Sequence, residues 1–80
     1  MVDVTSVEVV EDRTVRLQFS DGCARTVDLR PFLWGPVFER IADDDDFFRR
    51  VRVDEEIGTI VWPNGADLAP ELLHGDATKA

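Results

Sequence analysis

Apolar and polar residues alternate along the first third of the chain in a pattern that predicts an antiparallel β-meander. A β-branched run over residues 4–10 is typical of a first strand. Val15, Leu17 and Phe19 then alternate with polar residues, which is the period-2 pattern of a half-buried second strand. The turn Ser20-Asp21-Gly22 reverses the chain and predicts a third strand after it.

The turn between the second and third strands allows two registers. A two-residue Asp-Gly loop would place polar groups opposite the apolar residues of the second strand. A three-residue loop with Gly22 in the left-handed region pairs Phe19 with Cys23. The same register sets Val15 opposite Val27 and keeps the apolar side chains on one face, apart from Arg25 opposite Leu17. We predict this second register, because a slip of one residue would turn the whole strand over.

A short helix is predicted after the meander. The Gly35-Pro36 pair punctuates the chain, and proline suits the first position of a helix. Leu33, Val37 and Ile41 are four residues apart, so they fall on one helical face, which should pack on the core. The helix should end in the aspartate run at residues 43–46, after which two phenylalanines return the chain to the core.

A second hairpin and a final helix are predicted for the last third of the chain. Basic and apolar residues alternate over 50–53, and after a polar turn a last strand over 59–62 ends at Pro63, which has no N–H to donate. The final helix begins either with Asp67 as its cap or with Pro70 as its first residue, and the sequence leaves both open. Its expected apolar face consists of Leu68, Leu72 and Leu73.

These elements predict a single α+β domain over residues 1–75, with a small antiparallel sheet, two short helices and the order β-β-β-α-β-β-α. Residues 76–80 should be a frayed C-terminal tail. A chain of 80 residues allows one thin core and leaves little space for a deep active-site cleft.

The acidic composition narrows the classes of partner. Nine basic and seventeen acidic residues give a net charge of −8, which repels phosphate backbones and attracts basic proteins. We therefore expect no direct nucleic-acid binding by this chain alone. No apolar run approaches the roughly 18 residues of a membrane span, so no membrane association is expected. A single cysteine, Cys23, and the absence of a signal-peptide pattern predict a cytoplasmic location.

The candidate catalytic and metal-binding residues do not form a recognised sequence motif. The aspartate run at 43–46 lacks the glycine and the spaced ligands of a calcium loop, so we interpret it as a solvated acidic loop. His74 is the only histidine, and with one cysteine it falls short of a structural zinc site. Cys23 should be a small buried hydrophobic residue, although Arg25 is the kind of neighbouring cation that activates a thiol. We predict no catalytic residue, no metal ligand and no cofactor.

The tryptophans and a basic patch are the candidates for a protein interface. Trp62, in a β-branched strand, should lie in the core, whereas Trp34, in a Gly-Pro loop, fits a core lid and an interface anchor equally well. The turn at 63–65 should be structural, although the N–H groups that follow it could bind an anion or a peptide carboxylate. The basic patch is expected to pair mainly with the chain's own acids. The candidate interaction surface comprises Trp34, Arg49, Arg50, Arg52, Trp62, Asn64 and Asp67.

Several segments of the chain resemble one family of small bacterial domains of unknown function. They read LQFSDG at 17–22, VDL at 27–29, GPVFE at 35–39 and TIVWPNGADLAPELL at 59–73. The resemblance implies an α+β fold in a bacterial cytoplasmic protein, either free-standing or N-terminal to a helix-turn-helix. Free-standing members resemble one half of a two-gene module of the toxin–antitoxin kind. No activity or catalytic residue is established for the family, so none is carried over.

Three functions follow from these observations. The favoured one is a non-enzymatic protein-interaction or regulatory, antitoxin-like module that forms a homodimer or binds a small protein partner. Its contact surface would be the edge of the first strand or the loop that carries Trp34. The alternative is a nucleic-acid-associated regulator whose partner supplies the basic surface. The third, which we disfavour, is a small ligand-binding or hydrolytic enzyme using Asp28, Asp67 and His74.

Overall fold

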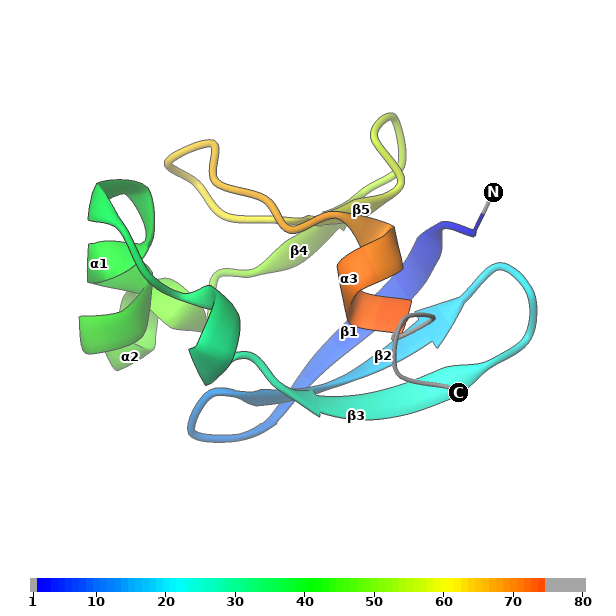
Figure 1. Ribbon diagram of the computed structural model, residues 1–80, viewed down its shortest axis with the longest axis horizontal. Coiled ribbons are helices and arrows are strands. Elements are labelled where there is room, and N and C mark those ends of the chain that lie inside the picture. The colour runs from blue at the N-terminus through cyan, green and yellow to red at the C-terminus, as the bar shows by residue number, and fades with distance from the viewer. Residues whose placement is uncertain (1, 75–80) are drawn as a thin grey trace.

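The computed structural model describes residues 2–74, which form an α+β fold as predicted. Helices α1 and α2 gather at one end of the molecule, and α3 lies beside the β-meander (Figure 1). The elements in chain order are β1 (Val4–Glu11), β2 (Thr14–Phe19), β3 (Ala24–Asp28), the 3-10 turn η1 (Arg30–Phe32), α1 (Pro36–Asp43), α2 (Asp45–Phe48), β4 (Arg52–Asp54), β5 (Thr59–Val61) and α3 (Pro70–His74). The predicted tail at 76–80 and the end of the predicted domain at residue 75 lie outside the described residues.

The meander β1-β2-β3 has the predicted register. Val15 pairs with Val27 across β2 and β3, and the Phe19 N–H donates to the Cys23 carbonyl at 2.9 Å. Gly22 adopts a φ of +90°, which places it in the region that favours glycine. The three-residue loop therefore keeps the apolar face of β2 toward the core.

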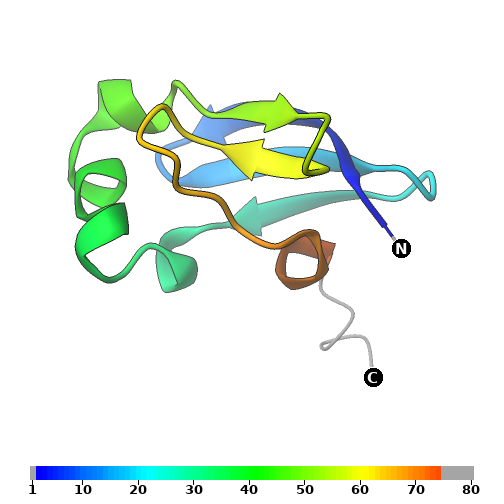
Figure 2. The ribbon, with the colours of Figure 1, turned by 90° about the horizontal axis from the view of Figure 1, so that it is seen from above.

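The second hairpin forms a sheet of its own instead of extending the meander. Strands β4 and β5 pair with each other in antiparallel fashion, as a separate two-stranded sheet. The hairpin nevertheless lies against β1 (Figure 2). The Val4 N–H donates to the Gly58 carbonyl at 2.8 Å. The predicted antiparallel strands are thus divided between two small sheets. The start of β1, expected to be a free edge, is partly occupied by the turn of this hairpin.

The aspartate run is structured, which differs from the solvated loop that the sequence predicts. Asp43 ends α1, and the Asp44 carboxylate accepts a hydrogen bond from the Phe47 N–H at 3.2 Å, which caps α2. Within the described residues there are thus three α-helices and one 3-10 turn, where two short helices were predicted. Phe47 and Phe48 in α2 are buried, as expected.

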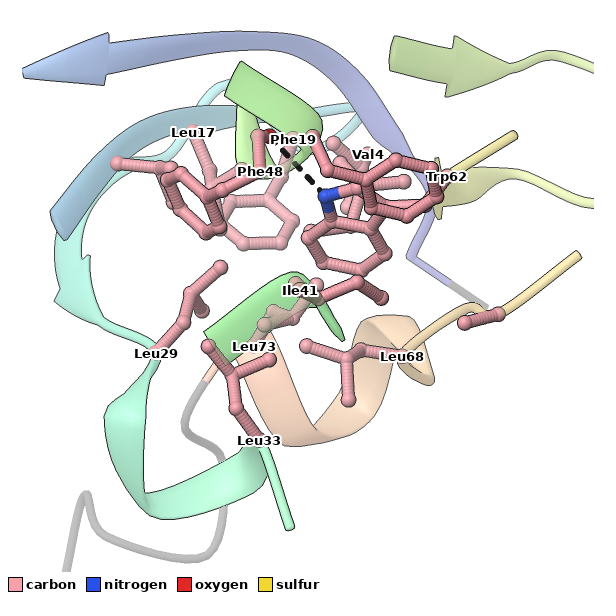
Figure 3. Packing of buried hydrophobic residues seen from close by; sticks show 14 residues of the cluster. Val4, Leu17, Phe19, Leu29, Leu33, Ile41, Phe48, Trp62, Leu68 and Leu73 are labelled. Atoms are coloured by element: carbon pink, nitrogen blue, oxygen red, sulfur yellow. Dashed lines mark hydrogen bonds between the residues drawn. The ribbon is translucent and has the colours of Figure 1, made fainter. Parts of the chain in front are cut away.

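The core joins β2, β5 and all three α-helices around Trp62 (Figure 3). The Trp62 Nε1–H donates to the Phe48 carbonyl at 3.0 Å, so its polar atom is satisfied inside the core. The fully buried side chains of largest volume are Trp62, Phe48, Leu17, Leu29, Ile41, Ile60, Leu73 and Val15. The prediction that Trp62 is a core residue is confirmed.

Three residues predicted to be buried are exposed instead. Val37 on α1 and Leu72 on α3 are 55% and 52% exposed, although helical spacing placed both on apolar faces. Leu33, which precedes α1, and Ile41 within it are buried, so Val37 is the exposed member of the predicted face. Cys23 is also exposed, because it lies in the turn that connects β2 to β3.

A buried arginine connects the β1–β2 turn to the helical end of the molecule. The Arg13 Nε–H and Nη2–H groups donate to the Ala42 carbonyl at 3.1 and 2.6 Å. Arg13 Nη1 lies 2.7 Å from an Asp45 carboxylate oxygen, and the guanidinium carbon lies 5.0 Å from the Phe48 ring centroid. Ala42 lies in the last turn of α1, whose carbonyls have no partner within the helix, so Arg13 fixes the C-terminal end of α1.

Candidate interaction groove

An apolar groove lies between the loop that enters α1 and the segment that leads into α3. Its volume is about 560 Å³, and its walls come from η1, α1, α3 and the residues that connect them. The groove is lined by Phe32, Trp34, Gly35, Pro36, Val37, Phe38, Asp67, Leu68, Ala69 and Leu72. The described part of the chain contains no helix long and apolar enough to cross a lipid bilayer.

The exposed hydrophobic side chains of the protein concentrate in this groove. Of the five large hydrophobic residues exposed within residues 2–74, three line the groove, namely Trp34, Val37 and Leu72. Trp34 is 76% exposed, which decides between its two predicted roles: it is not a lid on the core. Single exposed hydrophobic residues are ordinary, but their gathering around one concavity is typical of a binding surface.

Trp34 lies two residues before the start of α1. Gly35 follows it with a φ of +90°, and Pro36 is the first residue of α1. Proline fixes its own φ and restricts the residue before it. The segment that carries the indole therefore leads directly into the proline-initiated first turn of α1.

The floor of the groove is fastened to the core. Phe38 meets the Trp62 ring edge-on, with ring centroids 6.3 Å apart, and the buried Leu68 carbonyl accepts a hydrogen bond from the Thr59 hydroxyl. Asn64 Nδ2–H donates to the Val37 carbonyl at 3.1 Å, which joins the turn at 63–65 to α1. These contacts make the groove a preformed feature of the fold.

The ionisable groups around Trp34 are acidic. Asp67 lines the groove, and a second depression of about 360 Å³ on the other side of the Trp34-Gly35-Pro36 wall includes Glu39 and Asp43. Arg40 on α1 is engaged elsewhere, since its guanidinium carbon lies 4.3 Å from the Phe47 ring centroid and its Nε lies 3.8 Å from an Asp44 oxygen. The groove therefore offers an apolar surface with one carboxylate in its lining, and two further carboxylates line the neighbouring depression; we call these three carboxylates the acidic rim.

The predicted interaction residues do not all meet at one place. Trp34 and Asp67 line the groove, whereas Asn64 supports it through Val37. Trp62 is only 2% exposed, so its place in the predicted surface is corrected: it supports the groove from the core and offers no surface to a partner.

The basic patch lies outside the groove lining. Arg49, Arg50 and Arg52 are all exposed, and none of the three forms an ion pair with another of residues 2–74. The expectation that they pair with the chain's own acids was wrong for this part of the chain. They remain available to an acidic partner surface or to a phosphate backbone.

The fold does not assemble the hydrolytic trio considered above. The Asp28 carboxylate accepts a hydrogen bond from the Arg30 N–H at 3.0 Å, while Asp67 lines the groove. His74 lies at a third place, where its Nε2 is 3.0 Å from an Asp21 carboxylate oxygen. Asp28, Asp67 and His74 therefore lie at three separate places and do not form one catalytic site.

A group that the sequence reasoning missed does come together at the β2–β3 turn. Ligand atoms of Asp21, Cys23 and His74 all lie within 4.8 Å of one another. The Cys23 backbone N–H donates to Asp21 at 3.0 Å, and this bond, followed by the neighbouring His74, holds the pKa of Asp21 below its usual value. His74 is 53 residues from Asp21 in the chain, so spacing gave no signal. Only the three-residue turn, which places Asp21 beside Cys23, was visible in the sequence.

Comparison with known proteins identifies the family. The family model for a protein of unknown function (DUF2442) matches residues 4–78, which includes every helix and strand described above. No curated protein and no solved structure matches the chain. Because the match covers nearly all of the sequence, the chain belongs to the DUF2442 family of proteins of unknown function.

Proposed function

We propose that this protein is a non-enzymatic protein-interaction module of the regulatory, antitoxin-like kind. Its groove would bind an apolar segment of a basic protein partner. The observation that carries the proposal is the 76% exposure of Trp34 at the wall of a preformed apolar groove. Tryptophan is enriched among the residues that dominate interface energies.

The chemistry of the occupant follows from the groove and its rim. Apolar walls favour aliphatic or aromatic side chains, and the carboxylates of Asp67, Glu39 and Asp43 favour lysine or arginine beside them. A second copy of this chain would bring the same acidic rim and the same net charge of −8. Charge complementarity therefore favours a basic partner over self-association.

Peptide selection tests this chemistry even while the partner is unidentified. Random peptides displayed on phage are selected against the folded, full-length chain, and the enriched sequences are synthesised and measured by fluorescence anisotropy. We expect them to combine large apolar residues with lysine or arginine. Trp34→Ala should weaken their binding at least about 30-fold, which corresponds to the roughly 2 kcal/mol of an interface hot spot.

Two outcomes would contradict the proposal. Enrichment of acidic peptides would show that the rim does not select the occupant, and unchanged affinity for Trp34→Ala would show that the groove is not the site. Sedimentation of the free chain supplies the matching control for self-association. If the free chain is a dimer and Trp34→Ala converts it to a monomer, the groove binds a second copy of this chain instead of a basic partner.

A second candidate, a nucleic-acid-associated regulator acting with a basic partner, is favoured by the three arginines that have no ion pair among residues 2–74. In this case Arg49, Arg50 and Arg52 would add to a basic surface supplied by the partner. A gel shift with duplex DNA should show no binding by the free chain at physiological salt. Retention by the free chain would contradict this expectation, and its loss when the three arginines are replaced by glutamine would show that the chain itself supplies the basic surface.

A further inference from the structure

We propose that Asp21, Cys23 and His74 form a binding site for one zinc ion or a chemically similar divalent ion. The carboxylate, thiolate and imidazole would be its three protein ligands, and a fourth position would stay open. This goes beyond the interaction groove, whose lining contains none of the three. The cluster is composed of residues from the β2–β3 turn and the end of α3, and its ligand atoms lie within 4.8 Å of one another.

The spacing of the ligand atoms is close to that of a tetrahedral site. Bonds of about 2.0 to 2.3 Å at tetrahedral angles place ligand atoms about 3.3 to 3.7 Å apart. The His74 Nε2 and Asp21 Oδ2 atoms are 3.0 Å apart, and the remaining distances are at most 4.8 Å. Binding of an ion therefore requires His74 Nε2 and Asp21 Oδ2 to move apart by a few tenths of an ångström. It also requires the Cys23 sulfur to move closer, which a side-chain rotation can achieve.

Both sides of the site are held in place before any ion binds. Asp21 Oδ1 accepts the Cys23 N–H at 3.0 Å, which leaves Oδ2 directed at His74. The His74 ring packs edge-on against the buried Phe19 at a centroid distance of 4.8 Å, and its side chain is only 16% exposed. Arg25 Nη1–H donates to the Leu73 carbonyl at 3.2 Å and so fixes the last turn of α3 against β3.

The donor set selects the class of ion. Calcium and magnesium prefer a shell of oxygens, whereas one sulfur and one imidazole nitrogen suit zinc and its neighbours among the transition metals. The thiolate and the carboxylate together carry two negative charges, which balance the ion. On binding, the Cys23 thiol releases its proton, and Nε2 of His74 binds the ion while the ring proton resides on Nδ1.

The Asp21 carboxylate already joins the other two residues, since it lies 3.0 Å from His74 Nε2 and is hydrogen-bonded by Cys23. Cysteine is among the residue types most often buried, and Cys23 is exposed at this turn. The expectation of no metal site rested on the count of one histidine and one cysteine. The fold adds Asp21 as the third ligand and leaves the fourth position for water, as in zinc sites that keep an open position.

Cobalt titration of the reduced, full-length chain tests the proposal. Cobalt(II) substitutes for zinc and gives a thiolate-to-cobalt charge-transfer band that reports a bound cysteine. We expect saturation at one ion per chain, displacement by zinc, and loss of the band in Cys23→Ser. Asp21→Asn and His74→Gln should each weaken binding at least about 10-fold, which is the size of effect seen even for residues that only support metal ligands.

The control is a variant in the other acidic cluster. Asp43→Asn/Asp46→Asn should leave cobalt binding unchanged. Absence of the charge-transfer band in the wild-type chain, a band that survives Cys23→Ser, or binding that depends on the aspartate run would each overturn the proposal. Cys23 is exposed, and serine preserves its shape, so the Cys23→Ser result does not depend on a change in folding. Circular dichroism of each variant verifies this.

Discussion

The buried Arg13 should be one of the most stabilising polar side chains of this protein, and Arg13→Met tests that expectation. Methionine retains the apolar stem and removes the guanidinium. The substitution deprives the Ala42 carbonyl of two hydrogen bonds, at 3.1 and 2.6 Å, and removes the cation from the Phe48 ring. Because Ala42 lies in the last turn of α1, its carbonyl has no replacement donor within the helix.

The magnitude follows from these contacts. Leaving a polar group buried and unpaired costs about 1 to 3 kcal/mol, and a hydrogen bond from a charged donor contributes about 1.5 to 3 kcal/mol. The ion pair with Asp45 adds little, since the Asp45 side chain is 77% exposed and exposed pairs contribute about 0 to 1 kcal/mol. We therefore expect Arg13→Met to lower the free energy of unfolding by about 3 kcal/mol and Asp45→Asn by less than about 1 kcal/mol.

Urea unfolding followed by circular dichroism measures both variants. A loss of about 3 kcal/mol is a large part of the total stability of a small domain, so the midpoint of Arg13→Met should fall well below that of the wild type. Equal losses for Arg13→Met and Asp45→Asn would refute the reasoning, because the surface ion pair rather than the carbonyl contact would then hold the helical end in place.

Two further predictions concern the β2–β3 turn. Gly22→Val should destabilise the domain by at least about 1 kcal/mol, and by more than Gly22→Asn, because a β-branched residue is strained at positive φ. Beyond the two adjacent residues no atom lies within 4 Å of an added Cβ, so equal urea midpoints for wild type and Gly22→Val would contradict the assigned backbone conformation. The folded-state pKa of Asp21 is lowered, so its stabilising contribution is complete above the unfolded pKa of about 3.9 and is lost as pH falls through the folded pKa. Asp21→Asn keeps an acceptor for the Cys23 N–H and removes the titrating carboxyl group. The urea midpoint of this variant should therefore decline less than that of the wild type on acidification from about pH 5 to about pH 2. Equal declines in the two urea midpoints would count against the lowered pKa of Asp21.

The local pattern of the sequence predicted the β-rich part of the fold well. Alternation in β2 and the need to keep its apolar residues on one face fixed the hairpin register, which was confirmed at Val15 and Val27. Helix α2 was missed because four residues are too few to show a helical period, and its cap, Asp44, looked like part of a solvated acidic run. The separate β4–β5 sheet depends on packing against β1, which local pattern does not encode.

The surface was less predictable, because exposure and convergence are properties of the folded chain. Helical spacing assigned Val37 and Leu72 to buried faces, whereas the fold leaves both at the open groove. Trp34 could be assigned only once the structure showed that it is 76% exposed. His74 approaches Asp21 only because α3 packs beside the β2–β3 turn, and no sequence spacing reports such a contact.

The central claim, that the groove is the binding surface, is tested most directly by a matched pair of valines. Val37 in the groove and Val10 on β1 are 55% and 53% exposed, so Val37→Thr and Val10→Thr make the same near-isosteric change at equally exposed positions. Affinity for a selected apolar and basic peptide is measured by calorimetry for both. The account predicts at least about fivefold weaker binding for Val37→Thr, equivalent to roughly 1 kcal/mol for burying a hydroxyl, and unchanged binding for Val10→Thr. Equal affinities for the two variants, or weakening by Val10→Thr alone, would contradict it and move the binding surface away from the groove.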